Sequence, residues 1–84
     1  MTTMGPQISF QPIDVLTASE DREGRLVLVD GKLAAVLVRL SDQAHDPLLR
    51  GAWYFEAGFG LLDSRHELFA SLEEAAASIE LSLL

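Results

Sequence analysis

Cysteine is absent from this chain of 84 residues, which excludes disulfide bonds, thiolate metal ligands and cysteine nucleophiles. The chain also lacks a long apolar run, since the longest near-continuous one spans Leu33–Val38 and a bilayer-spanning helix needs roughly 20 residues. Its first residues, MTTMG, contain no basic region followed by an apolar stretch, which a secretory signal requires. We therefore expect a cytoplasmic protein without a membrane partner.

Basic residues are few, with 6 Lys and Arg against 13 Asp and Glu and a net charge of −7. Proteins that bind nucleic acid neutralise phosphates with clustered Lys and Arg, whereas the arginines here are scattered along the chain. The composition therefore argues against a nucleic-acid partner. Solubility explains the excess of acidic residues, and a basic protein partner is the alternative.

Motifs for catalysis and cofactor binding are also missing. The segment AGFG contains a lone Gly-x-Gly, without the third glycine and the following helix of a dinucleotide site. The serines lack the flanking motif of an activated nucleophile. His45 and His66 lie in separate polar segments, with one nitrogen ligand each. We expect no enzyme activity, no cofactor and no metal site.

Apolar residues make up 49% of the sequence, and their strongest pattern is RLVLVDGKLAAVLVRL at 25–40. Two β-rich runs flank Asp30-Gly31, a dipeptide that suits the two positive φ angles of a type I′ hairpin turn. This turn predicts that Val29 pairs with Lys32 and that Val27 pairs with Ala34.

With that register both faces of the hairpin are apolar, whereas a half-exposed antiparallel hairpin alternates apolar with polar residues. One face would carry Leu26, Leu28, Leu33, Ala35 and Leu37. The other would carry Val27, Val29, Ala34, Val36 and Val38. Each face therefore needs a cover.

A third strand is predicted over 53–59, where large apolar residues alternate with mixed ones. The C-terminal tail has helical spacing, because apolar residues recur every three or four positions from Leu72 to Leu83. Ser71 with Glu74 forms a capping box that favours a helix start there, and Ser64 with Glu67 is the alternative start. A start at Ser71 leaves residues 66–69 extended, as a candidate short edge strand.

These elements predict an α+β fold, an antiparallel meander of three strands, or four, with one C-terminal α-helix packed on one face. The chain is a single small domain, 1–84, with a loosely ordered N-terminal segment 1–12 that includes a candidate short strand at Ile8–Phe10. The residues expected to face the helix are Leu26, Leu28, Leu33, Ala35, Leu37, Trp53, Phe55 and Phe59. The inverted assignment is the alternative.

One helix covers one face, so the second face is left for a partner. Monomers rarely expose a large apolar patch, and a two-fold dimer needs only one self-complementary surface. We therefore expect a non-catalytic protein-interaction or regulatory module that acts as a homo-oligomer. The candidate interface residues are Val27, Val29, Val36, Val38 and Tyr54.

Two alternatives remain open at this point. In the first, the N-terminal residues Ile8, Phe10, Ile13, Val15 and Leu16 fold back over the second face and leave a monomer. In the second, the chain is a small ligand-binding or catalytic domain with a pocket beside the aromatic strand 53–59. The pocket residues would then be Glu56, Tyr54 and His66.

Overall fold

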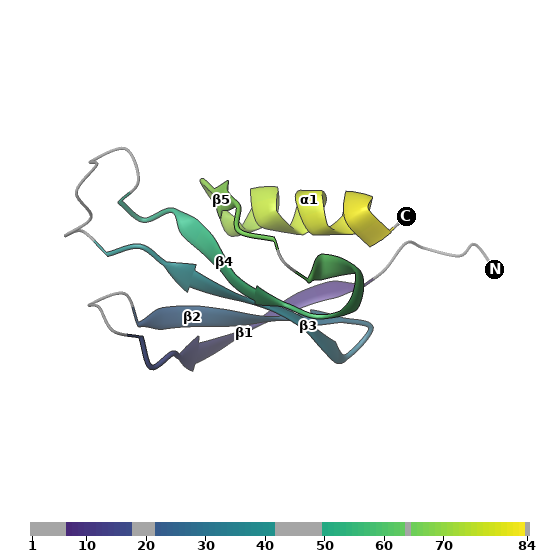
Figure 1. The fold of residues 1–84 in the computed structure, drawn as a ribbon, viewed down its shortest axis with the longest axis horizontal. Coiled ribbons are helices and arrows are strands. Elements are labelled where there is room, and N and C mark those ends of the chain that lie inside the picture. The colour runs from purple at the N-terminus through teal and green to yellow at the C-terminus, as the bar shows by residue number, and fades with distance from the viewer. Residues whose placement is uncertain (1–6, 18–21, 42–49, 64, 84) are drawn as a thin grey trace.

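The computed structural model describes residues 7–17, 22–41, 50–63 and 65–83. Five strands form one antiparallel sheet in chain order, followed by a single helix (Figure 1). The predicted α+β class is confirmed, and the sheet has more strands than expected. The elements are β1 (Ile8–Asp14), β2 (Glu23–Val29), β3 (Lys32–Arg39), β4 (Trp53–Gly58), the 3-10 helix η2 (Gly60–Leu62), β5 (Leu68–Phe69) and α1 (Leu72–Leu83).

The hairpin between β2 and β3 turns at the predicted dipeptide. Asp30 has a φ of 52° and Gly31 a φ of 82°, the two positive angles of a type I′ turn. The turn sets Val29 opposite Lys32, as expected.

The register then shifts between Val27 and Leu28, so Val27 pairs with Ala35 and the predicted pairing with Ala34 is wrong. Ala34 is the extra residue of a β-bulge, and its carbonyl accepts a hydrogen bond from the Phe59 N–H at 2.9 Å. A slip of one residue moves side chains to the opposite face of a strand. The bulge therefore exchanges the faces that the sequence predicts for this part of β2.

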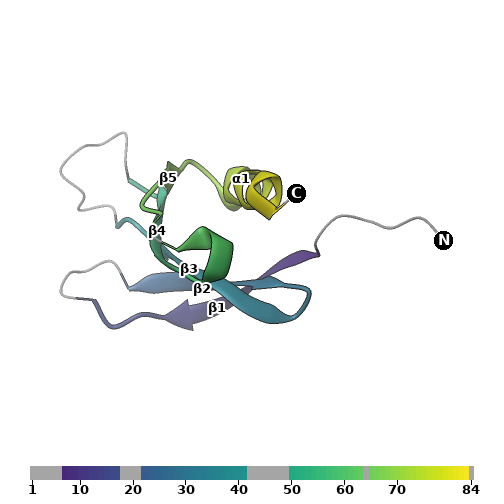
Figure 2. The ribbon, with the colours of Figure 1, turned by 45° about the vertical axis from the view of Figure 1, so that its right-hand side comes forward.

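The core lies between the sheet and one layer formed by α1 and η2, which Figures 1 and 2 show on the same side of the sheet. Its sheet residues include Val27, which the bulge places there. The predicted helix-facing set is right for Ala35, Leu37, Trp53 and Phe55. It is wrong for Leu26, Leu28 and Leu33, which lie on the opposite face, and for Phe59, which is 51% exposed where the chain leaves β4.

The helix begins after Ser71, as the first of the two capping boxes predicts. The Glu74 N–H donates to Ser71 Oγ at 3.1 Å, and the Glu74 carboxylate accepts from the Ala70 N–H at 2.6 Å. Both hydrogen bonds satisfy backbone donors at the first turn. The expected short strand is β5, and the alternative start at Ser64 lies outside the described residues.

Residues 8–12, expected in a loosely ordered segment, belong to β1 at the edge of the sheet. Residues 8–14 thus extend the sheet sideways instead of folding across its second face, and Leu16 is fully exposed. No helix within the described residues is long and apolar enough to cross a bilayer.

Candidate interaction surface

The face of the sheet opposite α1, here called the open face, is defined by the strand pairings. Twelve positions point to it: Ser9, Gln11, Ile13, Gly24, Leu26, Leu28, Leu33, Val36, Val38, Tyr54, Ala57 and Leu68. None of these paired positions is charged, whereas Glu56, the unpaired bulge residue between Phe55 and Ala57, directs an exposed carboxylate to the same side. No helix of the described chain covers this face.

The open face is partly accessible to solvent. Leu26, Leu28 and Val36, in the adjacent strands β2 and β3, are half-buried. Leu33 and Leu68 are each 44% exposed at the ends of the same surface. A sheet face in contact with water normally carries polar residues at such positions. Leu33 and Leu68 are instead apolar residues exposed to solvent.

One corner of the open face is covered by the chain itself. Val38 is only 2% exposed, and its cross-strand partner is Gly24. A Cβ added to Gly24 would lie 2.5 Å from Val15 Cγ2, so Val15 occupies the space above this glycine. The accessible part of the open face therefore lies between this corner and the hairpin turn.

The five residues predicted for the interface are divided between the two faces. Val27 is fully buried in the core and Val29 packs against that core, on the side of α1. Val38 lies on the open face under the covered corner. Val36 and Tyr54 lie on the open face and keep some exposure.

The sequence prediction missed Leu26 and Leu28, which replace the two valines of β2 on the open face. A regular type I′ hairpin would place Leu26 and Leu28 on the face of the sheet toward the helix. The residues around Ala34 contain no pattern that predicts a bulge. The open face is apolar with either set of residues, since both alternating sets of the hairpin are apolar.

Of the three residues proposed for a ligand pocket, two come together. The Tyr54 hydroxyl lies 3.3 Å from His66 Nδ1, and the two rings stack with centroids 6.4 Å apart. Glu56 is exposed at the second register shift, between β3 and β4. His66 is exposed as well, so the pair lies at the rim of the open face.

A separate groove of about 440 Å³ lies at the other edge of the sheet and is open to solvent. It is lined by Pro12, Ile13, Asp14, Glu23 and Arg25. Arg25 is already engaged, since it donates to the Gly24 carbonyl at 2.8 Å and lies 5.0 Å from the Trp53 ring centroid. Within the described ranges no three His, Asp or Glu residues gather as metal ligands, and His45 lies outside those ranges.

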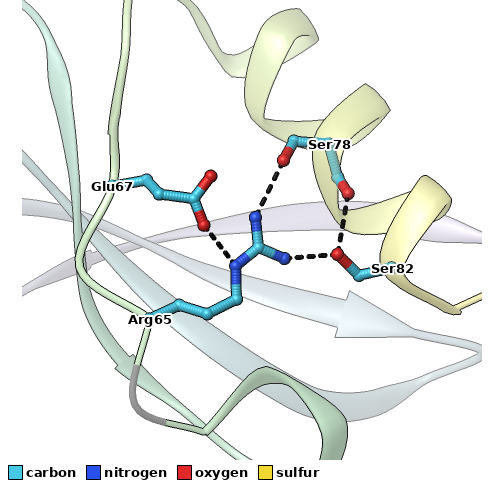
Figure 3. A network of polar contacts seen from close by, with 4 residues as sticks. All are labelled: Arg65, Glu67, Ser78 and Ser82. Atoms are coloured by element: carbon cyan, nitrogen blue, oxygen red, sulfur yellow. Dashed lines mark hydrogen bonds and ion pairs between the residues drawn. The ribbon is translucent and has the colours of Figure 1, made fainter.

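The densest polar network holds α1 against the sheet (Figure 3). Arg65 forms an ion pair with Glu67 and donates to Ser78 Oγ at 2.8 Å and to Ser82 Oγ at 2.6 Å. Its guanidinium also lies 5.3 Å from the Phe55 ring centroid. The hydrogen bond from Arg65 and its positive charge lower the pKa of Glu67. These contacts join the segment before β5 to α1, which is a structural role.

Comparison of the chain with protein-family models, with curated proteins and with solved structures finds no match in any of the three. The function is therefore argued from the geometry of the described residues.

Proposed function

We propose that this domain is a non-catalytic protein-interaction module that forms a homo-oligomer through its open face. The observation that carries the proposal is the low charge of that face, because its twelve paired positions are uncharged and Glu56, at the bulge in β4, is the one charged residue that the described strands direct to it. At the chain average of 23% charged residues, about three of the twelve positions would be charged (12 × 0.23). The centres of protein interfaces are depleted in charge in the same way.

The net charge of −7 supports self-association through this particular surface. Two copies of an acidic chain repel each other wherever their carboxylates meet. The charged residues of β2 and β3 lie on the other side of the sheet, where Arg25 stacks on Trp53. Contact through the open face therefore brings no like charges from these strands together, and one self-complementary patch is enough for a two-fold dimer. The proposal keeps the cytoplasm, which the sequence predicts, as the compartment.

The first prediction concerns Leu28→Glu, which places a carboxylate on the open face. We expect the parent to be a dimer at high micromolar concentration, and we expect Leu28→Glu to be a folded monomer. The reason is that a buried contact with an unpaired charge is strongly disfavoured. Light scattering after size-exclusion chromatography measures the mass, and circular dichroism checks the fold.

The matched control is Ala77→Glu, which adds the same charge on the exposed side of α1. It should retain the mass of the parent. A parent that is monomeric at high micromolar concentration would contradict the proposal, and so would equal dissociation of the two variants.

A further inference from the structure

The two edges of the sheet are less suited than its open face to contact with a second copy of the chain. Along β1, the Asp30 N–H donates to the Gln7 carbonyl at 2.9 Å and the Val15 N–H donates to the Arg22 carbonyl at 2.8 Å. Hydrogen-bonded and non-hydrogen-bonded pairs alternate in an antiparallel ladder. The backbone N–H and C=O groups of the odd-numbered residues from 7 to 15 therefore point toward β2, and those of the even-numbered residues point outward from the edge.

Pro12 falls at one of these outward positions. It costs the sheet no hydrogen bond, and it removes an N–H from the middle of the exposed edge. Asp14, at the next outward position, adds a carboxylate at the end of the same edge. Proline and charge are the devices by which natural sheets prevent pairing along an edge strand. A second copy therefore finds an interrupted ladder along β1.

The opposite edge is formed by β5, which has only 2 residues. Very short edge strands offer too few backbone groups for another chain to continue the sheet. Both edges of this sheet are thus poor templates for β-strand addition, whereas the open face between them is largely apolar.

We propose that the second copy packs its open face against the open face of the first, sheet on sheet, about a two-fold axis that lies between the two sheets. This inference rests on the proposed self-association and specifies its geometry. Sheets that pack in this way lie about 10 Å apart with their side chains interdigitated. The residues at the centre of the contact are Leu26 and Val36, which pair between β2 and β3.

The size of the face indicates how tight such a dimer is. Four strands of six to eight residues and the two residues of β5, about 4.8 Å apart at about 3.3 Å per residue, present about 500 Å². Two such faces together bury about 1,000 Å², which is the lower limit for a specific interface. The covered corner at Val38 reduces this area further. The geometry therefore predicts a reversible dimer that dissociates on dilution.

Disulfide trapping tests the geometry, because the chain has no cysteine and each variant introduces a single thiol. In a sheet-on-sheet dimer the two-fold axis passes close to the centre of the face. The thiol of Val36→Cys in one copy therefore lies near the same thiol in the other copy. In a dimer that continues the sheet through β1, the two Val36 positions are five strand spacings apart, about 24 Å. No disulfide spans that distance.

The experiment oxidises Val36→Cys at a concentration where light scattering shows the reduced variant to be a dimer. Ala77→Cys, on the exposed side of α1, measures collisional cross-linking. We expect Val36→Cys to form the disulfide-linked dimer at least about tenfold faster than this control, because the local concentration of the second thiol is higher. If Val36→Cys itself dissociates, Leu26→Cys takes its place.

The outcomes separate this inference from the proposed function. A monomeric parent overturns both. A dimeric parent whose Val36→Cys variant is trapped no faster than Ala77→Cys overturns the sheet-on-sheet geometry and leaves self-association standing. Fast trapping of Gln11→Cys in β1 without trapping of Val36→Cys would move the contact from the centre of the open face to the β1 side of the sheet.

Discussion

Single residues in this fold meet requirements of the backbone that few other side chains satisfy. The turn needs two positive φ angles, at Asp30 and Gly31, and the Asp30 carboxylate also accepts a hydrogen bond from the Gln7 N–H at 3.0 Å. Gly58 has a different reason, since an added Cβ would lie 2.1 Å from the Leu62 carbonyl oxygen. The first requirement is local, and the second arises only when η2 packs on β4.

Replacing Gly31 with Val puts a β-branched side chain at a φ of 82°, where such residues are strongly disfavoured. We expect the free energy of unfolding to fall by about 1–3 kcal/mol, the cost of a strained residue. Gly31→Asn is the matched control and should lose less, because Asn tolerates the left-handed region. Urea unfolding measures both, and equal stability of Gly31→Val and the parent would refute the turn assignment.

Glu67 makes the stability depend on pH through Arg65. The hydrogen bond and the charge of Arg65 lower the pKa of Glu67 from its ordinary value of 4.5. The unfolded chain therefore binds the proton more readily, so this contribution is complete above about pH 4.5 and is lost as the pH falls through the lowered pKa. Glu67→Gln removes it.

We expect the parent to lose more stability than Glu67→Gln between about pH 6 and pH 3, as measured by thermal unfolding across that range. Glu56→Gln, which removes another exposed carboxylate, is the control for the change in net charge. Identical pH profiles for the parent and Glu67→Gln would show that the ion pair adds nothing to stability.

At the scale of secondary-structure elements, α1 is defined by local contacts at its start and by long-range contacts along its length. Ser71 and Glu74 satisfy donors of its first turn, whereas Ala75 and Ile79 are buried against the sheet. A helix of 12 residues is marginal on its own in water. Its stability therefore depends on both the cap and the packed face.

Ser71→Ala removes the side-chain acceptor of the cap, and we expect a loss of about 1 kcal/mol in the free energy of unfolding. Ser71→Asp keeps an acceptor and adds a negative charge at the positive end of the helix dipole, so it should match or exceed the parent. Chemical denaturation distinguishes the two variants. A parent-like Ser71→Ala would mean that the Ser71 hydroxyl adds nothing to the stability of the start of α1.

The whole molecule combines a net charge of −7 with a sheet face whose twelve paired positions are uncharged. In a dimer the two copies approach closely, so their like charges oppose association at low ionic strength. Added salt screens this repulsion, because the Debye length falls to about 10 Å at 0.1 M. The twelve open-face positions carry no charge, so the proposed contact has no ion pair among them that added salt would weaken.

We therefore expect the dimer to tighten severalfold between about 20 mM and about 200 mM NaCl, as measured by sedimentation over a dilution series. The same series with Leu28→Glu should show little association at either salt concentration. A dimer that weakens as salt is added would indicate a contact built on opposite charges and would argue against the open face.

The sequence by itself determined the features that depend on neighbours along the chain. Asp30-Gly31 specifies its turn through backbone conformation, and Ser71 with Glu74 specifies the helix start through hydrogen bonds within one turn. Alternating and helical spacing predicted the elements of the α+β fold. The apolar character of both hairpin faces likewise follows from the residues alone, because either register leaves an apolar set on each side.

Only the tertiary structure decided which set faces the helix. The bulge at Ala34 moves Val27 into the core and leaves Leu26 and Leu28 on the open face. A bulge costs little where both alternating sets are apolar, so periodicity did not distinguish the registers. The choice depends on fitting β3 at once to β2, to β4 and to the chain after β4, where the Phe59 N–H bonds the Ala34 carbonyl. These contacts join residues far apart in the chain, and no local pattern encodes them.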